Sequence, residues 1–211
     1  MPDPEIAERF GRDTARHEMS VLHDDGLYRH LRFRNPAESE YWFDLITWPG
    51  CLTINGDMDT FTFARTTDMF ELFRSRYGIN PQYWAEKARA VPRDGLTRYD
   101  ESLFRLRVFE AFSDAVRGGY APPGLAAAIR AEVLGSSETG SEDGARGVLR
   151  DFEHDGFRFS DVWEWDLCGW SYQYLWCCHA IQWGIGQYDA HRDADGAAAY
   201  REHREREMAS A

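Results

Sequence analysis

The sequence predicts an α+β protein in which an antiparallel meander of about four to five strands packs against several helices. Between residues 17 and 65, runs of aromatic and β-branched residues alternate with turns too short for a parallel crossover. From residue 66 onward, apolar residues recur at helical spacing. The stretch 161–189 is apolar on nearly every face and holds five of the eight tryptophans, which is typical of a long helix buried in a core.

Strands are expected in the N-terminal part of the chain. The segment 41–48, YWFDLITW, has the strongest strand composition, and Pro49-Gly50 provides a turn after it. Asp24-Asp25-Gly26 predicts the turn of a β-hairpin. The expected strands cover residues 17–23, 27–34, 41–48, 51–55 and 60–65.

Helices are expected before and after this sheet region. Asp3, Thr67, Asn80 and Ser160 are candidate N-caps, because their side-chain oxygens can accept hydrogen bonds from the first free backbone amides of a helix. A short helix should follow Asn80-Pro81. The other expected helices cover residues 4–15, 67–77, 100–117, 125–134, 145–153 and 161–189.

The length of 211 residues predicts a single domain. Within it we expect the antiparallel sheet at 17–65, a helical part at 66–134 and C-terminal helices at 145–189. The segment 135–144, GSSETGSEDG, is small and acidic without an apolar residue, which predicts a flexible linker. The residues 190–211 have little to bury and are expected to form an exposed tail.

Charge and cysteine content limit the classes of partner. The net charge of −12 argues against nonspecific nucleic-acid binding and against an anionic membrane surface. Four cysteines without a secreted spacing pattern, and an N-terminus without the apolar run of a signal peptide, predict a cytoplasmic protein. The uncharged run 167–186 is long enough to span a membrane, but its glutamines, histidine and scattered tryptophans favour a buried helix.

Three histidines and one carboxylate are the candidate catalytic residues. His17, His23 and His30 lie on or near the expected hairpin, and the shared parity of His17 and His23 could place both on one side. Asp44 interrupts the most apolar strand, so it either faces solvent or is buried with a partner. The arginines available to pair with it are Arg32, Arg34 and Arg65.

Cys177-Cys178-His179 suggests a metal ligand set. Successive helix residues point about 100° apart, so adjacent cysteines are poor ligands for one tetrahedral ion. We therefore expect small core residues beside a hydrogen-bonded histidine, and neither a metal nor a cofactor.

Five segments together resemble a known family. They are DDGLYRHLRFR (24–34), YWFDLITWPGCLTINGDM (41–58), TFTFARTTDMFELFR (60–74), INPQYWAEK (79–87) and YLWCCHAIQWGIGQYD (174–189). Over most of the chain between 17 and 189, this order of segments is similar to a family of bacteriophage and prophage proteins known only as hypothetical proteins. In these relatives glycine usually occupies the position of Asp59. The resemblance implies a phage gene product in the bacterial cytoplasm, with no activity or catalytic residues to transfer.

Two classes of function remain open. The first is an accessory binding protein that engages a host protein, for example to counter a defence, or a small ligand. Its expected surface is the aromatic and acidic rim of the sheet, comprising Trp48, Asp57, Asp59, Arg65, Tyr83 and Trp84. The alternative is a small hydrolytic or nucleotide-modifying enzyme that uses histidine and aspartate groups of the sheet. The lack of any familiar catalytic or nucleotide-binding motif favours the binding protein.

Overall fold

A computed structural model describes the backbone of residues 4–209 and the side chains of residues 4–195. The chain, which we expected to be one domain, folds into two compact units. The sheet unit comprises residues 1–96 and 170–211, and the helical unit comprises residues 97–169. The helical unit is therefore inserted in sequence between the sheet and the C-terminal helix.

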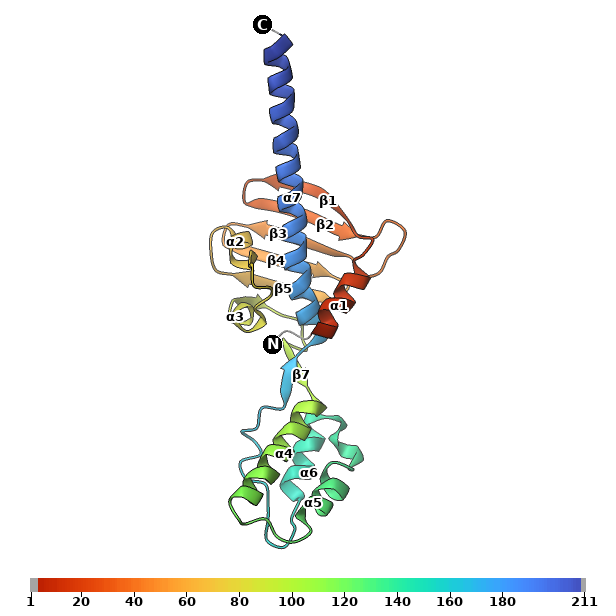
Figure 1. The fold of residues 1–211 in the computed structure, drawn as a ribbon, viewed down its shortest axis with the longest axis vertical. Helices are drawn as coiled ribbons and strands as arrows, with labels where there is room; N and C mark the ends of the chain where they lie inside the picture. Colours follow the sequence, from red (N-terminus) through yellow and green to blue (C-terminus); the bar gives the residue numbers. More distant parts are fainter. Residues whose placement is uncertain (1–3, 210–211) are drawn as a thin grey trace. The chain divides into compact units, whose positions relative to one another are not determined.

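The sheet unit contains a six-stranded antiparallel sheet whose strands neighbour one another in chain order (Figure 1), which confirms the predicted meander. Five strands match the expected ones to within a few residues. The sixth, β6, was not predicted because its sequence Ala-Arg-Ala has no strand signal. The strands are β1 (Glu18–Asp25), β2 (Tyr28–Arg34), β3 (Phe43–Trp48), β4 (Cys51–Gly56), β5 (Asp59–Ala64) and β6 (Ala88–Ala90).

One face of the sheet, called here the inner face, carries the core. In β2 to β5 the alternation of the strands sends every second side chain to this face, and most polar residues lie on the opposite, outer face. Helix α7 (Tyr172–Ala209) runs across the inner face (Figure 1). The fully buried side chains of the inner face are Leu31, Phe33, Phe43, Leu45, Leu52, Ile54, Phe61 and Phe63.

The long tryptophan-rich helix begins at Tyr172, so the predicted start at Asp161 is wrong. Ser171 ends the preceding extended segment, and its Oγ accepts a hydrogen bond from the amide of Tyr174 at 3.2 Å. Ser171, rather than Ser160, is therefore the N-cap. The backbone stays helical to Ala209, and the side chains of 191–195 are exposed as expected for the tail. Within the described part of the chain, no helix combines the length and the apolar character that a membrane span requires.

Three short helices complete the sheet unit: α1 (Pro4–Asp13), α2 (Met69–Phe73) and α3 (Pro81–Ala85). Helix α2 is shorter than predicted and is capped by Asp68 instead of Thr67. Asn80 caps α3 as predicted, accepting a hydrogen bond from the amide of Tyr83 at 3.1 Å. The proposed cap of α1, Asp3, lies outside the described residues.

The helical unit has its own core, formed between its helices and the segment 157–167. Its elements are β7 (Thr97–Tyr99), α4 (Glu101–Arg117), α5 (Leu125–Ala128), a π-helical turn (Ile129–Val133), a 3-10 helix (Ser137–Gly140) and α6 (Glu142–Asp151). Strand β8 (Cys168–Trp170) begins in this unit, and its last residue belongs to the sheet unit. The expected linker 135–144 is folded. Thr139 is buried, its carbonyl accepts a hydrogen bond from the hydroxyl of Tyr99 at 2.8 Å, and Ser141 caps α6.

The β4–β5 turn contains Asp59 at φ 75°, in the left-handed region. Aspartate is among the few residues other than glycine that adopt this conformation at modest cost.

Gly184 allows α7 to approach the sheet closely. A Cβ atom at Gly184 would lie 2.8 Å from Cδ1 of Leu45 and 3.1 Å from Cζ of Phe33, whereas one at Gly186 would meet nothing within 4 Å. We expect Gly184→Val to lower the free energy of unfolding by about 1–3 kcal/mol because it overpacks the core. Gly186→Ala should raise it by about 0.5–1 kcal/mol through helix propensity. Urea unfolding of both variants checks this, and equal effects would contradict the close approach.

Candidate functional site

A buried carboxylate lies at the centre of the outer face of the sheet. Asp44 is only 3% exposed, although it is on the face that α7 does not cover. Its Oδ1 accepts a hydrogen bond from Nε of Arg32 at 2.8 Å, and its Oδ2 accepts one from Nη2 of Arg32 at 2.8 Å. The same Oδ2 lies 2.9 Å from Nε2 of His30. The prediction that a buried Asp44 would have an arginine partner is confirmed, and Arg32 is that partner.

This cluster holds Asp44 as an anion. Burial raises the pKa of Asp44, but the hydrogen bonds from Arg32 and His30 outweigh burial and bring the pKa below its usual value. Register explains the contact, because Arg32 lies directly opposite Asp44 and His30 lies opposite Ile46 on the neighbouring strand.

A pocket of about 290 Å³ opens beside this cluster. Arg32 forms one wall, and its guanidinium carbon lies 5.5 Å from the ring centre of Trp42. Arg34, two residues along β2, lines the same pocket, and no hydrogen bond or ion pair joins its side chain to a described residue. The pocket is completed by Glu38 and Ser39 from the β2–β3 loop.

The three candidate histidines do not form one cluster. A β-bulge between Val21 and His23 reverses the parity of β1, so His23 lies opposite His30 on the outer face. His17 precedes β1, where its Nε2 lies 3.0 Å from the carbonyl oxygen of Tyr41 and its Nδ1 is buried without a hydrogen-bond partner. The inference from shared parity was therefore wrong. The structure brings His30 together with Asp44 and leaves His17 apart.

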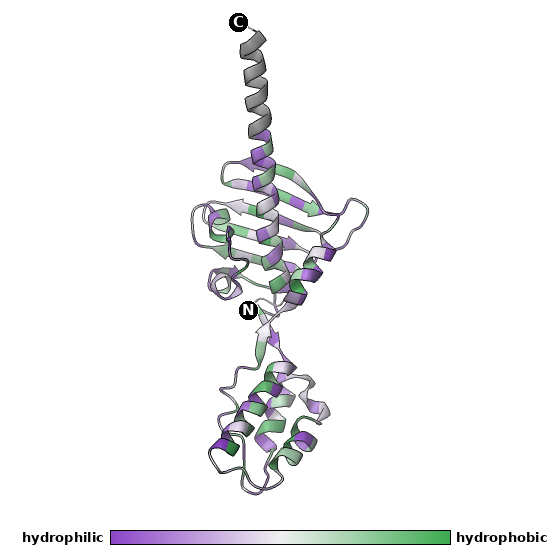
Figure 2. Cartoon of the chain, viewed as in Figure 1, coloured by the Kyte–Doolittle hydropathy of each residue, from purple (hydrophilic) through white to green (hydrophobic). Residues whose placement is uncertain are grey.

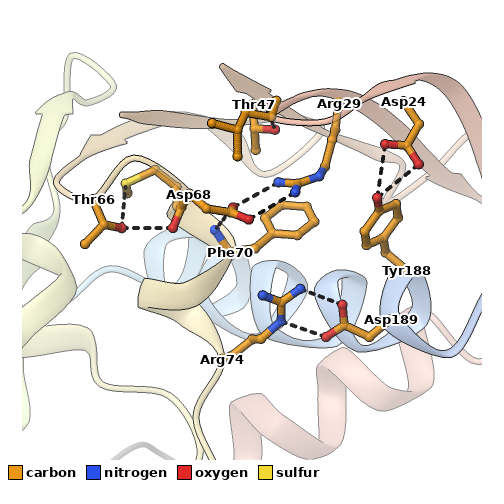
Figure 3. Close-up of polar contacts among 11 residues, drawn as sticks. Asp24, Arg29, Thr47, Thr66, Asp68, Phe70, Arg74, Tyr188 and Asp189 are labelled. Atoms are coloured by element: carbon orange, nitrogen blue, oxygen red, sulfur yellow. Dashed lines mark hydrogen bonds and ion pairs between the residues drawn. The ribbon is translucent and has the colours of Figure 1, made fainter. Parts of the chain in front are cut away.

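A second polar network, not predicted from the sequence, crosses the inner face between β2, α2 and α7 (Figure 3). Arg29 is buried, and its Nη1 and Nη2 donate to the two carboxylate oxygens of Asp68 at 2.9 and 3.0 Å. Its guanidinium carbon lies 4.6 Å above the ring centre of Phe70 and 5.6 Å from that of Tyr188. Asp68 also accepts a hydrogen bond from the amide of Phe70, so one carboxylate caps α2 and neutralises Arg29.

The network extends to the C-terminal helix. The hydroxyl of Tyr188 donates to Asp24 at 3.0 Å, and Arg74 donates to both carboxylate oxygens of Asp189 at 2.7 and 2.8 Å. These contacts fasten α7 to β1 and to the end of α2 (Figure 3). Because the guanidinium of Arg29 is enclosed by protein groups, the network is structural.

The predicted binding rim is not one surface. Trp84 is 1% exposed and packs edge-on against Phe73 with ring centres 4.8 Å apart, so the expectation that it is a surface residue was wrong. Successive antiparallel turns lie at opposite ends of a strand. Trp48 therefore lies near the β3–β4 turn with Arg65, while Asp57 and Asp59 lie at the other end of β4. Tyr83 is exposed on α3, where the Lys87 ammonium lies 4.5 Å from its ring centre.

Cys177 and Cys178 are buried in the core of the sheet unit, and burial raises the pKa of both thiols. His179 stacks on Phe10 with ring centres 5.9 Å apart, which agrees with a packing role. Its buried Nε2 atom has no hydrogen-bond partner among the described residues. Among the described side chains, no three His, Cys, Asp or Glu residues gather in a geometry suited to a metal ion.

The helical unit contains a larger groove, of about 560 Å³, between α4 and the segment 157–166. Arg146 on α6 fixes this segment by donating hydrogen bonds to the carbonyl oxygens of Val162 at 2.5 Å and Trp165 at 2.9 Å. The two arginines that line the groove are Arg107 and Arg158. They are outnumbered by five lining carboxylates, which are Glu110, Asp114, Asp161, Glu164 and Asp166.

Helix α4 also carries a second apolar face. Its buried face contributes Phe104, Val108 and Ala115 to the core of the helical unit. Apolar and polar segments alternate along the helix (Figure 2), and Leu106, Phe109 and Val116 are 46%, 64% and 53% exposed. The spacing of these three residues, with Ser113 between them, is the i, i+3, i+7, i+10 pattern of one helix face. We call this face the α4 stripe.

Neither the groove nor the α4 stripe was among the predicted sites. The signal was present in the sequence, because apolar residues of 101–117 fall on two helix faces, but only the structure shows which face is covered. No protein-family model, curated protein sequence or solved structure matches this chain.

Proposed function

We propose that this chain is a binding protein that engages a partner protein through the α4 stripe of the helical unit. The α4 stripe is the observation that carries the proposal. A helix on the surface of a folded unit needs one apolar face to pack against the core. A second apolar face that is exposed marks a surface that another polypeptide covers. Leu106, Phe109 and Val116 form such a second face.

The charge of the groove indicates the chemistry of the partner. Arg107 is paired with Glu110 at 2.8 Å, and Arg117 is paired with Asp114. No ion pair with a described residue engages Asp161 or Glu164. The stripe residues do not line the groove. The stripe fits the apolar face of a partner helix, and the excess of carboxylates on the same unit favours a partner helix whose charged residues are lysines and arginines.

We extend the proposal to the setting in which the protein acts. The resemblance to bacteriophage and prophage proteins supports an accessory protein that engages a host protein in the bacterial cytoplasm. A counter-defence role is one form that such an interaction can take, and the identity of the captured protein tests it.

The alternative is a small enzyme that uses His30 and Asp44. Their 2.9 Å contact favours it, because a carboxylate can orient the imidazole of a general base. Two observations weigh against it. Both oxygens of Asp44 are occupied by Arg32, and none of the hydrogen bonds among the described residues joins His30 to a hydroxyl or thiol that could serve as a nucleophile.

The test is affinity capture from bacterial lysate with the full chain as bait. The variant Phe109→Glu places a charge on the α4 stripe without touching a core residue, and Tyr77→Glu is the matched control because Tyr77 is 98% exposed in the sheet unit. We expect a protein that is retained by the wild type and by Tyr77→Glu and is lost by Phe109→Glu. Mass spectrometry identifies that protein.

A direct titration then decides the proposal. A synthetic peptide that covers the basic amphipathic helix of the captured protein should bind the wild type, and Glu164→Lys should weaken it about tenfold at low salt because one favourable charge contact becomes repulsive. Peptide binding that Phe109→Glu leaves unchanged would overturn the proposal. So would light scattering that shows a wild-type dimer and a Phe109→Glu monomer, since the occupant would then be a second copy.

A further inference from the structure

The outer face of the sheet contains a charged cluster that the fold does not require. Replacing a buried ion pair by apolar residues of similar volume is often neutral or stabilising, so such a pair is weak evidence of a stabilising role. Asp44 nevertheless occupies a buried position in the middle of β3, although Ile46 next to it on the same face shows that the strand accepts apolar residues there.

The cluster fixes the guanidinium of Arg32. Asp44 engages Nε and Nη2 of Arg32 through two parallel hydrogen bonds of 2.8 Å, which hold the plane of the group in one orientation. Nη1 of Arg32 makes no hydrogen bond to a described residue. The guanidinium of Arg32 is therefore already held in one orientation, and its Nη1 can still donate hydrogen bonds. Binding an oxyanion there would cost little further side-chain entropy.

A second guanidinium lines the same pocket. Arg34 lies two residues after Arg32 on β2, so both side chains point to the outer face. Their Cα atoms are about 7 Å apart along the strand. Two carboxylates share the surroundings of Arg34: Glu18, opposite it on β1, and Glu38 in the pocket wall. No ion pair joins Glu18 to Arg34, and Glu38 is paired with Arg16 at 3.4 Å.

We propose that this pocket binds a small molecule in which a phosphate or carboxylate group is attached to a flat ring. The two arginines receive the oxyanion, Ser39 adds a hydroxyl, and Trp42 presents an indole on which the ring stacks. A pocket of about 290 Å³ holds a group of this size. This site lies in the sheet unit, so it is independent of the partner surface on the helical unit.

Isothermal titration calorimetry with three probes tests the proposal: phenyl phosphate, benzoate and inorganic phosphate. We expect one-to-one binding of phenyl phosphate, benzoate or both, and the stronger of the two identifies the oxyanion. Arg34→Gln should weaken binding about tenfold or more, because it removes a charge-assisted hydrogen bond. Arg89→Gln on β6 removes the same charge elsewhere on the sheet and should change the Kd by less than about twofold.

Trp42→Leu tests whether the ring of the ligand stacks on the indole of Trp42. In the wild type phenyl phosphate should bind more tightly than inorganic phosphate, and this preference should disappear in Trp42→Leu while inorganic phosphate binds as before. Absence of saturable binding by all three probes would overturn the site, as would equal Kd values for Arg34→Gln and Arg89→Gln. A preference for phenyl phosphate that survives Trp42→Leu would overturn the stacking role of Trp42.

Discussion

Replacing Arg29 by methionine should lower the free energy of unfolding of the sheet unit by about 3–5 kcal/mol. Methionine fills much of the volume of the arginine stem, so the loss comes from the charge and not from a cavity. The carboxylate of Asp68, whose side chain is 20% exposed, would remain without its two hydrogen bonds from the guanidinium. The penalty is that of an uncompensated buried charge.

Two variants separate this cause from a general loss of surface charge. Arg74→Met breaks the pair with Asp189, but both partners are about 40% exposed, so we expect a loss of about 1 kcal/mol at most. The double variant Arg29→Met/Asp68→Ser removes both charges and keeps an N-cap for α2, since serine also caps helices. It should be more stable than Arg29→Met alone.

The measurement needs a signal confined to the sheet unit, because two units can unfold separately. Hydrogen–deuterium exchange of the β2–β4 amides during urea unfolding supplies it. Equal losses for Arg29→Met and Arg74→Met, or a double variant less stable than the single one, would contradict the buried-pair interpretation.

The same pair makes the stability of the wild type depend on pH. Burial raises the pKa of Asp68, but the hydrogen bonds from Arg29 and from the amide of Phe70 outweigh it and leave the pKa lowered. A carboxyl whose pKa is lower in the folded state stabilises the fold fully above its unfolded-state pKa of about 4 and loses this contribution as the pH falls through the folded value. The decrease in the free energy of unfolding at acidic pH should therefore be smaller in Arg29→Met/Asp68→Ser than in the wild type.

The sequence was sufficient for the meander but not for its irregularities. Alternating apolar residues and short turns located five strands because both signals are local. The bulge after Val21 leaves no local signal, and it reversed the side on which His23 lies. Arg29 and Asp68 are 39 residues apart, and only the packing of α2 against the sheet brings them together. Asp44 was singled out because an acidic residue in an apolar strand is itself a local signal, but only the structure shows that it is buried.

The tryptophan-rich stretch 161–189 shows what the composition of a segment does not predict. Trp163 and Trp176 belong to the stretch 161–189 that was predicted to be one buried helix, yet Trp163 is 64% exposed in the helical unit and Trp176 is fully buried under the sheet. Leu167, between them, is buried in the core of the helical unit. Periodicity indicates that residues are apolar, but it cannot indicate which of two cores they join, and so the run was interpreted as one helix.

Substituting alanine for each of these two tryptophans tests that division. Trp176→Ala should cost about 3–5 kcal/mol, because the indole packs edge-on against Phe10 and Phe43, with ring centres 5.1 and 5.7 Å away, and its loss leaves a cavity. Its Nε1 also donates to Asp13 at 3.0 Å, which ties α1 to α7.

Trp163→Ala should change the free energy of unfolding by no more than about 0.5 kcal/mol, as expected for an exposed side chain. Trp176→Phe keeps an aromatic ring and removes the hydrogen bond to Asp13. Its decrease in the free energy of unfolding should therefore lie between those of the two alanine variants. Hydrogen exchange in the sheet unit and in the helical unit distinguishes where each change acts. If both alanine variants destabilised the sheet unit equally, the stretch 161–189 would contribute to a single core, and the separation into two units would be wrong.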